Sequence, residues 1–157
     1  MLTEELQAIK RQYEQLTQST ERQRLENASA NEAALTLPGN EQQRKLVSKL
    51  NNYLLSNNNF TNPDIERDSL ISELATNKTY LYDAIKIVTG KTLQEYINSF
   101  RLEEARRLLD SRSEYTILSI ASACGFNSYR TFQRLFRKKY RLSPGEYSKL
   151  ARTEGRV

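Results

Sequence analysis

Residues 116–140 read TILSIASACGFNSYRTFQRLFRKKY, and two short helical patterns meet in them at a glycine. In the first pattern, apolar residues recur at the i, i+3, i+4, i+7 spacing that is typical of one helix face: Ile117, Ile120, Ala121 and Cys124. Gly125 predicts the end of this helix, because glycine readily adopts the conformation that stops a helix.

A second helix is predicted to follow after a tight turn, with Asn127 or Ser128 as its N-cap. At about 100° per residue, its apolar side chains share one face, namely Phe132, Leu135 and Phe136. The opposite face is polar and mostly basic, with Arg130, Gln133, Arg134 and Arg137. The whole segment therefore predicts a helix-turn-helix whose second helix can enter a DNA major groove.

Charge is unevenly distributed along the 157 residues, although the net charge is only +5. Residues 1–40 hold four Lys and Arg against six Asp and Glu, whereas residues 41–157 hold twenty against thirteen. Between Phe126 and Leu142 there are six basic residues and no acidic one. Such a block is the electrostatic pattern expected of a protein that binds a polyanion.

The composition disfavours several classes of function. Histidine is absent and Cys124 is the single cysteine, so the usual zinc ligand sets and the commonest general base are missing. We predict no metal, no cofactor and no enzymatic activity, and we expect Cys124 to be a small buried side chain rather than a reactive thiol. No apolar run is long enough to cross a membrane and no signal peptide is recognisable, so a cytoplasmic protein is expected.

The first 26 residues carry a short heptad pattern with alternating spacings of four and three, formed by Leu2, Leu6, Ile9, Tyr13 and Leu16. Two interpretations stay open. The segment can be a solvated helix that frays, or a coiled coil that joins two chains into a homodimer through residues 2–16, with Glu5 and Lys10 paired across the dimer.

The remaining boundaries follow from turn and capping signals. Residues 27–40 lose periodicity and end in Pro38-Gly39-Asn40, which predicts a flexible linker. A DNA-binding domain is expected over 41–152, with a first lobe at 41–91, a linker helix at 92–111, a second lobe at 112–152 and a tail at 153–157. Capping boxes open the linker helix, with Thr92 and Glu95, and the last helix, with Ser143 and Glu146.

The two lobes are predicted to be copies of one structural unit. Asn77, Leu81 and Ile85 correspond to Ser128, Phe132 and Phe136 with a constant offset of 51 residues. About 18 helical residues between the copies span roughly 27 Å, close to the ~34 Å between successive major grooves on one side of a duplex. The predicted fold is therefore all-α, with two helix-turn-helix subdomains joined by a long linker helix and preceded by an amphipathic helix.

Two longer stretches resemble a known family. Residues 121–147, ASACGFNSYRTFQRLFRKKYRLSPGEY, and residues 74–109, LATNKTYLYDAIKIVTGKTLQEYINSFRLEEARRLL, are similar to the AraC/XylS type of bacterial transcription regulators. The shared motifs are G-F-x-S, F-x-R-x-F-[KR] and P-x-E-[YF] in the second lobe, and R-x-x-x-A-x-x-L-L in the linker helix. The resemblance extends from Glu41 to about Ala151.

This resemblance implies a sequence-specific regulator, by family preference an activator, that reads two adjacent major grooves of double-stranded DNA. RNA polymerase is a further expected partner. The base-reading positions fall on Arg130, Gln133 and Arg134 in the second lobe and on Thr79, Tyr82 and Asp83 in the first. Many members carry Gln or Arg where this chain has Tyr82 and Asp83, so the first lobe departs from the family pattern at two of its base-reading positions. The N-terminal segment lacks the family's small-molecule barrel and is similar to the cytoplasmic connector of membrane-anchored members.

The remaining polar residues of both motifs are candidates for phosphate contacts: Asn77, Lys78, Ser128, Tyr129, Arg137, Lys138, Lys139 and Arg141. Each has a simpler alternative, since an exposed basic side chain or tyrosine can merely keep a helix face solvated. The alternative function is a helical protein-interaction adaptor whose basic face binds an acidic partner. Such an adaptor would not distinguish promoter DNA from random duplex.

Overall fold

The computed structural model describes residues 2–30, 38–65, 67–111 and 114–154. All regular elements in these ranges are helical, which confirms the predicted all-α class. The α-helices are α1 (Leu2–Ala30), α2 (Glu41–Leu55), α3 (Arg67–Glu73), α4 (Lys78–Thr89), α5 (Leu93–Asp110), α6 (Ile117–Ala123), α7 (Tyr129–Tyr140) and α8 (Pro144–Glu154), and a 3-10 segment, η1 (Ser56–Thr61), follows α2.

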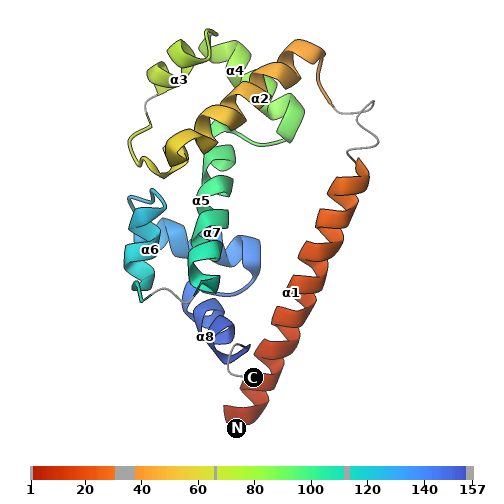
Figure 1. The fold of residues 1–157 in the computed structure, drawn as a ribbon, viewed down its shortest axis with the longest axis vertical. Helices are drawn as coiled ribbons and strands as arrows, with labels where there is room; N and C mark the ends of the chain where they lie inside the picture. The colour runs from red at the N-terminus through yellow and green to blue at the C-terminus, as the bar shows by residue number, and fades with distance from the viewer. Residues whose placement is uncertain (1, 31–37, 66, 112–113, 155–157) are drawn as a thin grey trace.

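Two lobes lie at the two ends of α5, with α2, α3 and α4 around one end and α6, α7 and α8 around the other (Figure 1). Each lobe has its own apolar core, and α5 contributes to both. Leu93 and Ile97 belong to the first core, whereas Leu102, Ala105 and Leu109 belong to the second. The linker helix is therefore unbroken and is shared structurally by the two lobes.

The predicted caps form as hydrogen-bonded pairs. The Thr92 hydroxyl accepts from the Glu95 backbone N–H at 3.2 Å, and the Glu95 carboxylate accepts from the Thr92 N–H at 2.9 Å. Ser143 and Glu146 form the same reciprocal pair at the start of α8, with Pro144 as the first helical residue. Because these bonds satisfy N–H groups that the helix leaves unpaired, the sequence specifies where α5 and α8 begin.

The turns of the two helix-turn-helix motifs differ by one residue. The first helix of the first motif is closed by a hydrogen bond from the Thr76 N–H to the Ile71 carbonyl. The equivalent bond of the second motif, from the Phe126 N–H to the Ala121 carbonyl, lies 50 residues later in the chain. The N-caps of the second helices, Asn77 and Ser128, lie 51 residues apart. The second turn thus contains one extra residue. The left-handed position is Ala75 in the first turn, with φ 50°, and Gly125 in the second, with φ 98°.

We predict that Ala75→Gly stabilises the protein by about 0.5–1 kcal/mol. A non-glycine residue in the left-handed region is strained by roughly 1–2 kcal/mol, and this relief exceeds the extra backbone entropy that glycine loses on folding. Urea denaturation measures the change. Ala123→Gly at the exposed end of α6 is the matched control and should bring no gain, since Ala123 has helical geometry. A lower midpoint for Ala75→Gly would contradict the prediction.

Part of the heptad seam of α1 packs on the second lobe of the same chain. Its half-buried residues Ile9, Tyr13 and Leu16 pack against the core of the second lobe within the same chain, and the Tyr13 and Tyr147 rings lie 5.8 Å apart in a T-shaped arrangement. The second lobe thus covers part of the seam, while Leu6 stays half exposed. The helix also continues to Ala30, four residues past its expected end, and half of the predicted linker, residues 31–37, lies outside the described residues.

Candidate nucleic-acid interface

Helix α7 has an aromatic inner face and a polar outer face. Phe132 and Phe136 are completely buried, with their ring centroids 5.6 Å apart, and the Phe132 ring lies 5.2 Å from that of Phe126 in the preceding turn. On the other face, Arg130, Gln133 and Arg134 are all exposed, as are Arg137 and Lys138. The inner rings thus hold the helix against the core while its outer residues face solvent.

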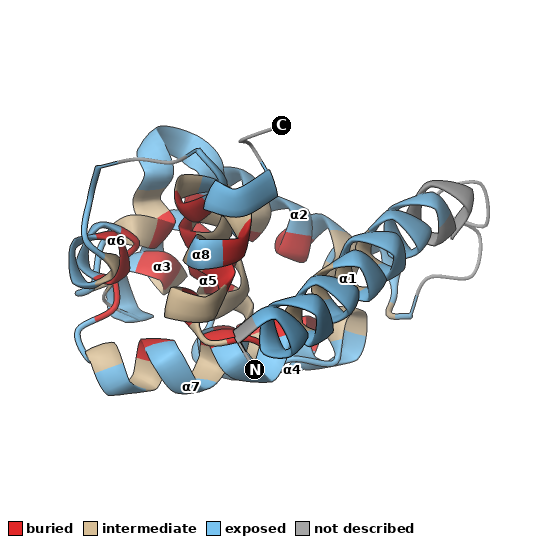
Figure 2. Ribbon diagram, turned by 90° about the horizontal axis from the view of Figure 1, so that it is seen from below, coloured by how far each residue is buried: buried red, intermediate tan, exposed pale blue. Residues whose placement is uncertain are grey.

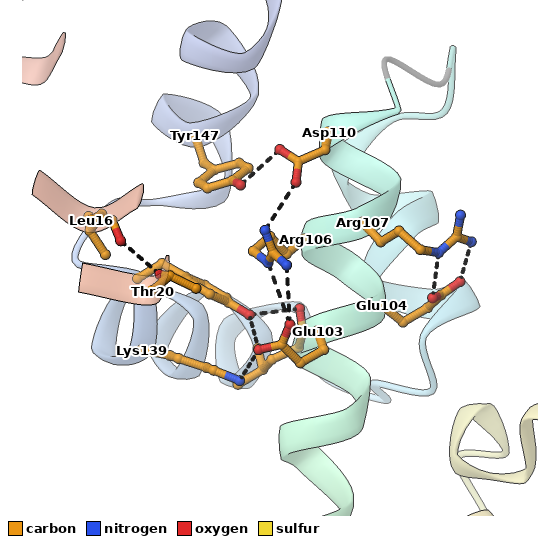
Figure 3. A network of polar contacts seen from close by, with 11 residues as sticks. Leu16, Thr20, Glu103, Glu104, Arg106, Arg107, Asp110, Lys139 and Tyr147 are labelled. Carbon is orange, nitrogen blue, oxygen red and sulfur yellow. Dashed lines mark hydrogen bonds and ion pairs between the residues drawn. The ribbon is translucent and has the colours of Figure 1, made fainter. Parts of the chain in front are cut away.

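A polar network ties α7 and α8 to α5 (Figure 3). The Lys139 ammonium lies 2.7 Å from the Glu103 carboxylate, and the Tyr140 hydroxyl donates to the same carboxylate at 3.2 Å. From α8, the Tyr147 hydroxyl donates to Asp110 at 2.8 Å. Burial opposes ionisation of Glu103, but the hydrogen bond and the charge of Lys139 outweigh it and lower its pKa. Lys139, a phosphate candidate by sequence, is thus also part of the support of α7.

The N-terminal end of α7 is capped by Ser128, whose hydroxyl accepts from the Thr131 N–H at 3.2 Å. Of the two predicted caps, Ser128 is therefore the one used. Tyr129, another phosphate candidate, is half-buried and its ring centroid lies 6.1 Å from that of Phe132. At the other end, Arg141 is exposed and ends the helix in the left-handed conformation, with φ 63°.

Helix α4 presents a less basic outer face. Thr79 and Asp83 are exposed, as is Lys78, and the Asn77 side chain caps the helix by accepting from the Tyr80 N–H at 2.9 Å. Tyr82 departs from its expected outward position because it is half-buried against the first core. The Lys78 ammonium lies 5.8 Å from the centre of the Tyr82 ring. The first lobe therefore offers fewer freely exposed candidates than the second.

Both helices lie on one side of the molecule. Figure 2 shows α4 and α7 along the same edge of the molecule, and in Figure 1 α4 passes behind α2 and α7 passes behind α5. The three outward residues of α7 come together on one helix face, but the length of α5 separates them from the candidates on α4. Both motifs therefore present their second helices on the same side of the molecule, at opposite ends of α5.

The family model for the helix-turn-helix domain of AraC type matches residues 70–150, which is half of the chain. The chain belongs to the AraC-type helix-turn-helix family. The match includes both candidate reading helices and the whole of α5, so the resemblance found in the sequence is confirmed. The AraC-type architecture also accounts for the shared linker helix and for the repeated motif.

Among related proteins, the HTH-type transcriptional activator RhaS of Escherichia coli is 35% identical over 81 residues, which are 52% of this chain and 29% of RhaS. The chain thus corresponds to less than a third of the length of the curated relatives that it matches. The C-terminal domain of AraT, a response regulator from Geobacillus stearothermophilus, is 27% identical with a TM-score of 0.59, covering 66% of this chain and 84% of that domain. The DNA-binding domain of AdpA is 20% identical with a TM-score of 0.60, covering 72% and 95%, and shares the fold.

Sequence reasoning missed one residue that connects the lobes. Arg101 is the first residue of the family motif R-x-x-x-A-x-x-L-L, and it is buried in the middle of α5. A signal was present, because Ile97, Arg101 and Ala105 recur at a spacing of four and therefore share the apolar face of the helix. In the described part of the chain, no helix is both long enough and hydrophobic enough to span a bilayer.

Proposed function

We propose that this chain is a transcription regulator that binds double-stranded DNA with α7 in one major groove and α4 in the next, without chemistry on a substrate. The observation that carries the proposal is the exposed Arg130, Gln133 and Arg134 face of a helix whose opposite face is completely buried. Buried aromatic rings hold this face in place, which limits the ordering that binding requires.

Each lobe has a distinct role in the proposal. Arg130 and Arg134 suit paired hydrogen bonds to guanine, and Gln133 suits adenine. In the first lobe, Asp83 can accept from a cytosine amino group while Thr79 contacts a neighbouring base, and the half-buried Tyr82 contributes mainly its hydroxyl edge. The exposed phosphate candidates supply affinity that does not depend on sequence, and they are Asn77, Lys78, Ser128, Arg137, Lys138, Lys139 and Arg141.

The expected biological setting is the cytoplasm of a bacterium, where the regulator has access to promoter DNA. RhaS is named a transcriptional activator, and its 35% identity over the matched domain supports activation by this chain as well. A contact with RNA polymerase is part of this proposal, since an activator acts on the transcribing enzyme.

Homodimerisation through residues 2–16 is a separate part of the proposal. Because Ile9, Tyr13 and Leu16 pack on the second lobe, two chains can pair through this seam only if α1 leaves that lobe. Sedimentation of the chain with and without Ile9→Asp would test the pairing. A monomer in both cases, at all concentrations, would remove the dimer from the proposal.

Selection from a random duplex library tests the proposed function directly. We expect an enriched motif with two half-sites about ten base pairs apart, and an affinity that falls steeply between 50 and roughly 200 mM salt as counterions are released. The adaptor alternative instead predicts binding without an enriched motif. Duplex binding that ignored both sequence and salt would exclude the proposed mechanism.

A further inference from the structure

Arg101 is buried where α5 passes from the first core to the second. Only 6% of the residue is exposed, and no other charged residue in the described ranges is buried. Its Nε donates to the Phe60 carbonyl at 2.7 Å and its Nη2 to the Asn62 carbonyl at 2.9 Å, while Nη1 donates to the Asn98 side chain at 3.3 Å. The guanidinium therefore holds the end of η1, in the first lobe, against the middle of α5.

Burying this charge is unfavourable by itself. Burial lowers the pKa of Arg101, and no ion pair with a carboxylate offsets it in the described ranges. The planar fork of a guanidinium, however, presents donors on separate nitrogens in a fixed geometry, so Nε and Nη2 each bind one backbone carbonyl. The bonding pattern thus points to a geometric role, since the side chain joins a loop to a helix that lies about forty residues away in sequence.

The turn of the second lobe contacts the same place. A Cβ added to Gly125 would lie 2.7 Å from the Thr61 carbonyl oxygen and 3.0 Å from Arg101 Nε, with the glycine at φ 98°. Only a residue without a side chain allows the second turn to lie this close to the backbone of η1. Residues 60–62, Arg101 and Gly125 therefore form one interlobe junction, close to the place where η1 and α6 approach each other in Figure 1.

The interlobe junction lies close to the start of α7 along the chain, since Gly125 precedes Tyr129 by four residues. On the other side, residues 60–62 follow α2, which packs against α4 in the first core. The buried apolar residues of α5 divide between the two cores, with Leu93 and Ile97 in the first and Leu102, Ala105 and Leu109 in the second. The junction is thus a direct link between the two lobes that does not pass through the length of the linker helix.

We propose that Arg101 and Gly125 position the two reading helices relative to each other, and so make the protein select the spacing between half-sites. Arg101 is a positioning residue that acts without contacting DNA. The inference rests on the proposed function, because spacing has meaning only if both α4 and α7 bind. One base pair added between half-sites rotates them by about 34° around the duplex, a change that a rigid pair of lobes cannot follow.

The test compares the selected duplex with versions that have one base pair added or removed between the half-sites. We expect the parent chain to lose about 100-fold in affinity on the altered spacings, because the second lobe can no longer bind together with the first. Arg101→Met and Gly125→Ala should each reduce this penalty to below about tenfold, with weaker binding to the original spacing. Arg107→Met is the matched control on the exposed side of α5, and should keep the full penalty.

A measurement without DNA separates this inference from the proposed function. Spin labels at Ile87→Cys on α4 and Leu118→Cys on α6 occupy exposed positions, and the native Cys124 is buried, with its pKa raised to about 12, so it should not react. We expect one narrow distance distribution in the parent chain and in Arg107→Met. Arg101→Met and Gly125→Ala should broaden it while circular dichroism stays helical. Arg101→Lys keeps the charge and a single donor nitrogen, and its distribution should be intermediate between those of the parent chain and Arg101→Met.

The outcomes are distinguishable. If the distance distribution broadens in Arg101→Met and Gly125→Ala but no DNA motif is selected, the structural role of the interlobe junction holds and the proposed function is excluded. Narrow distances in both variants, or an unchanged spacing penalty on DNA, would overturn the positioning role of Arg101 and Gly125. If Arg101→Met does not fold, Gly125→Ala and Arg101→Lys decide the question, since both leave a guanidinium or an ammonium at position 101.

Discussion

Phe132→Ala should lower the free energy of unfolding by about 3–5 kcal/mol and abolish DNA binding along with it. The Phe132 side chain is completely buried and its ring packs between those of Phe126 and Phe136. Truncation leaves a cavity beneath the outer face of α7, and the surrounding rings can fill it only in part. Thermal and urea denaturation give the loss of stability, and duplex binding is measured below the new melting temperature.

The matched control is Leu118→Ala on the neighbouring helix α6. Leu118 is 61% exposed, so its truncation should change stability by less than about 0.5 kcal/mol. If both variants melted like the parent chain, Phe132 would not support α7, and the assignment of the inner and outer faces of this helix would be wrong.

Arg134→Ala should preserve the fold and weaken binding by about 1–3 kcal/mol, with the loss concentrated at one base position of the selected motif. Arg134 is exposed on the middle of α7, one residue from Gln133 and four from Arg130, so it belongs to the same outward face. A bidentate contact to guanine distinguishes that base from the other three. Without the Arg134 side chain, all four bases should therefore be accepted at this position of the motif.

Two comparisons make this result specific. Arg152→Ala in α8 removes the same charge from an exposed position away from α7, and should leave the selected motif unchanged. Lys138→Ala should weaken binding to all sequences about equally and reduce the salt dependence, as a phosphate contact does. Equal weakening on every sequence by Arg134→Ala would reassign Arg134 to the phosphate class.

The local elements were predictable because their signals are local. Helix starts follow from side chains three residues apart, as for Thr92 and Glu95, and helix faces follow from the 3.6-residue period, as for Phe132 and Phe136. The same period placed the outward residues of α7 correctly on an exposed face. Whether these residues contact bases stays a prediction.

The interactions that join distant segments were not predictable in the same way. The heptad pattern of α1 is equally suited to a second copy of itself and to any apolar surface, and the structure places it on the second lobe. Lys139 reads as one of six similar basic residues until Glu103 of α5 is brought within 2.7 Å. Tyr82 follows the outward phase of α4, but the first core covers half of it.

By itself, the sequence determined the all-α class, the two repeated motifs, the helix caps and the polarity of each helix face, because these properties depend on neighbours within a few residues. Only the tertiary structure decided which surface covers α1, which cation of α7 pairs with α5, and how the lobes meet at Arg101 and Gly125. Those contacts join residues 24 to more than 100 positions apart, and their formation depends on packing geometry that no short-range pattern encodes.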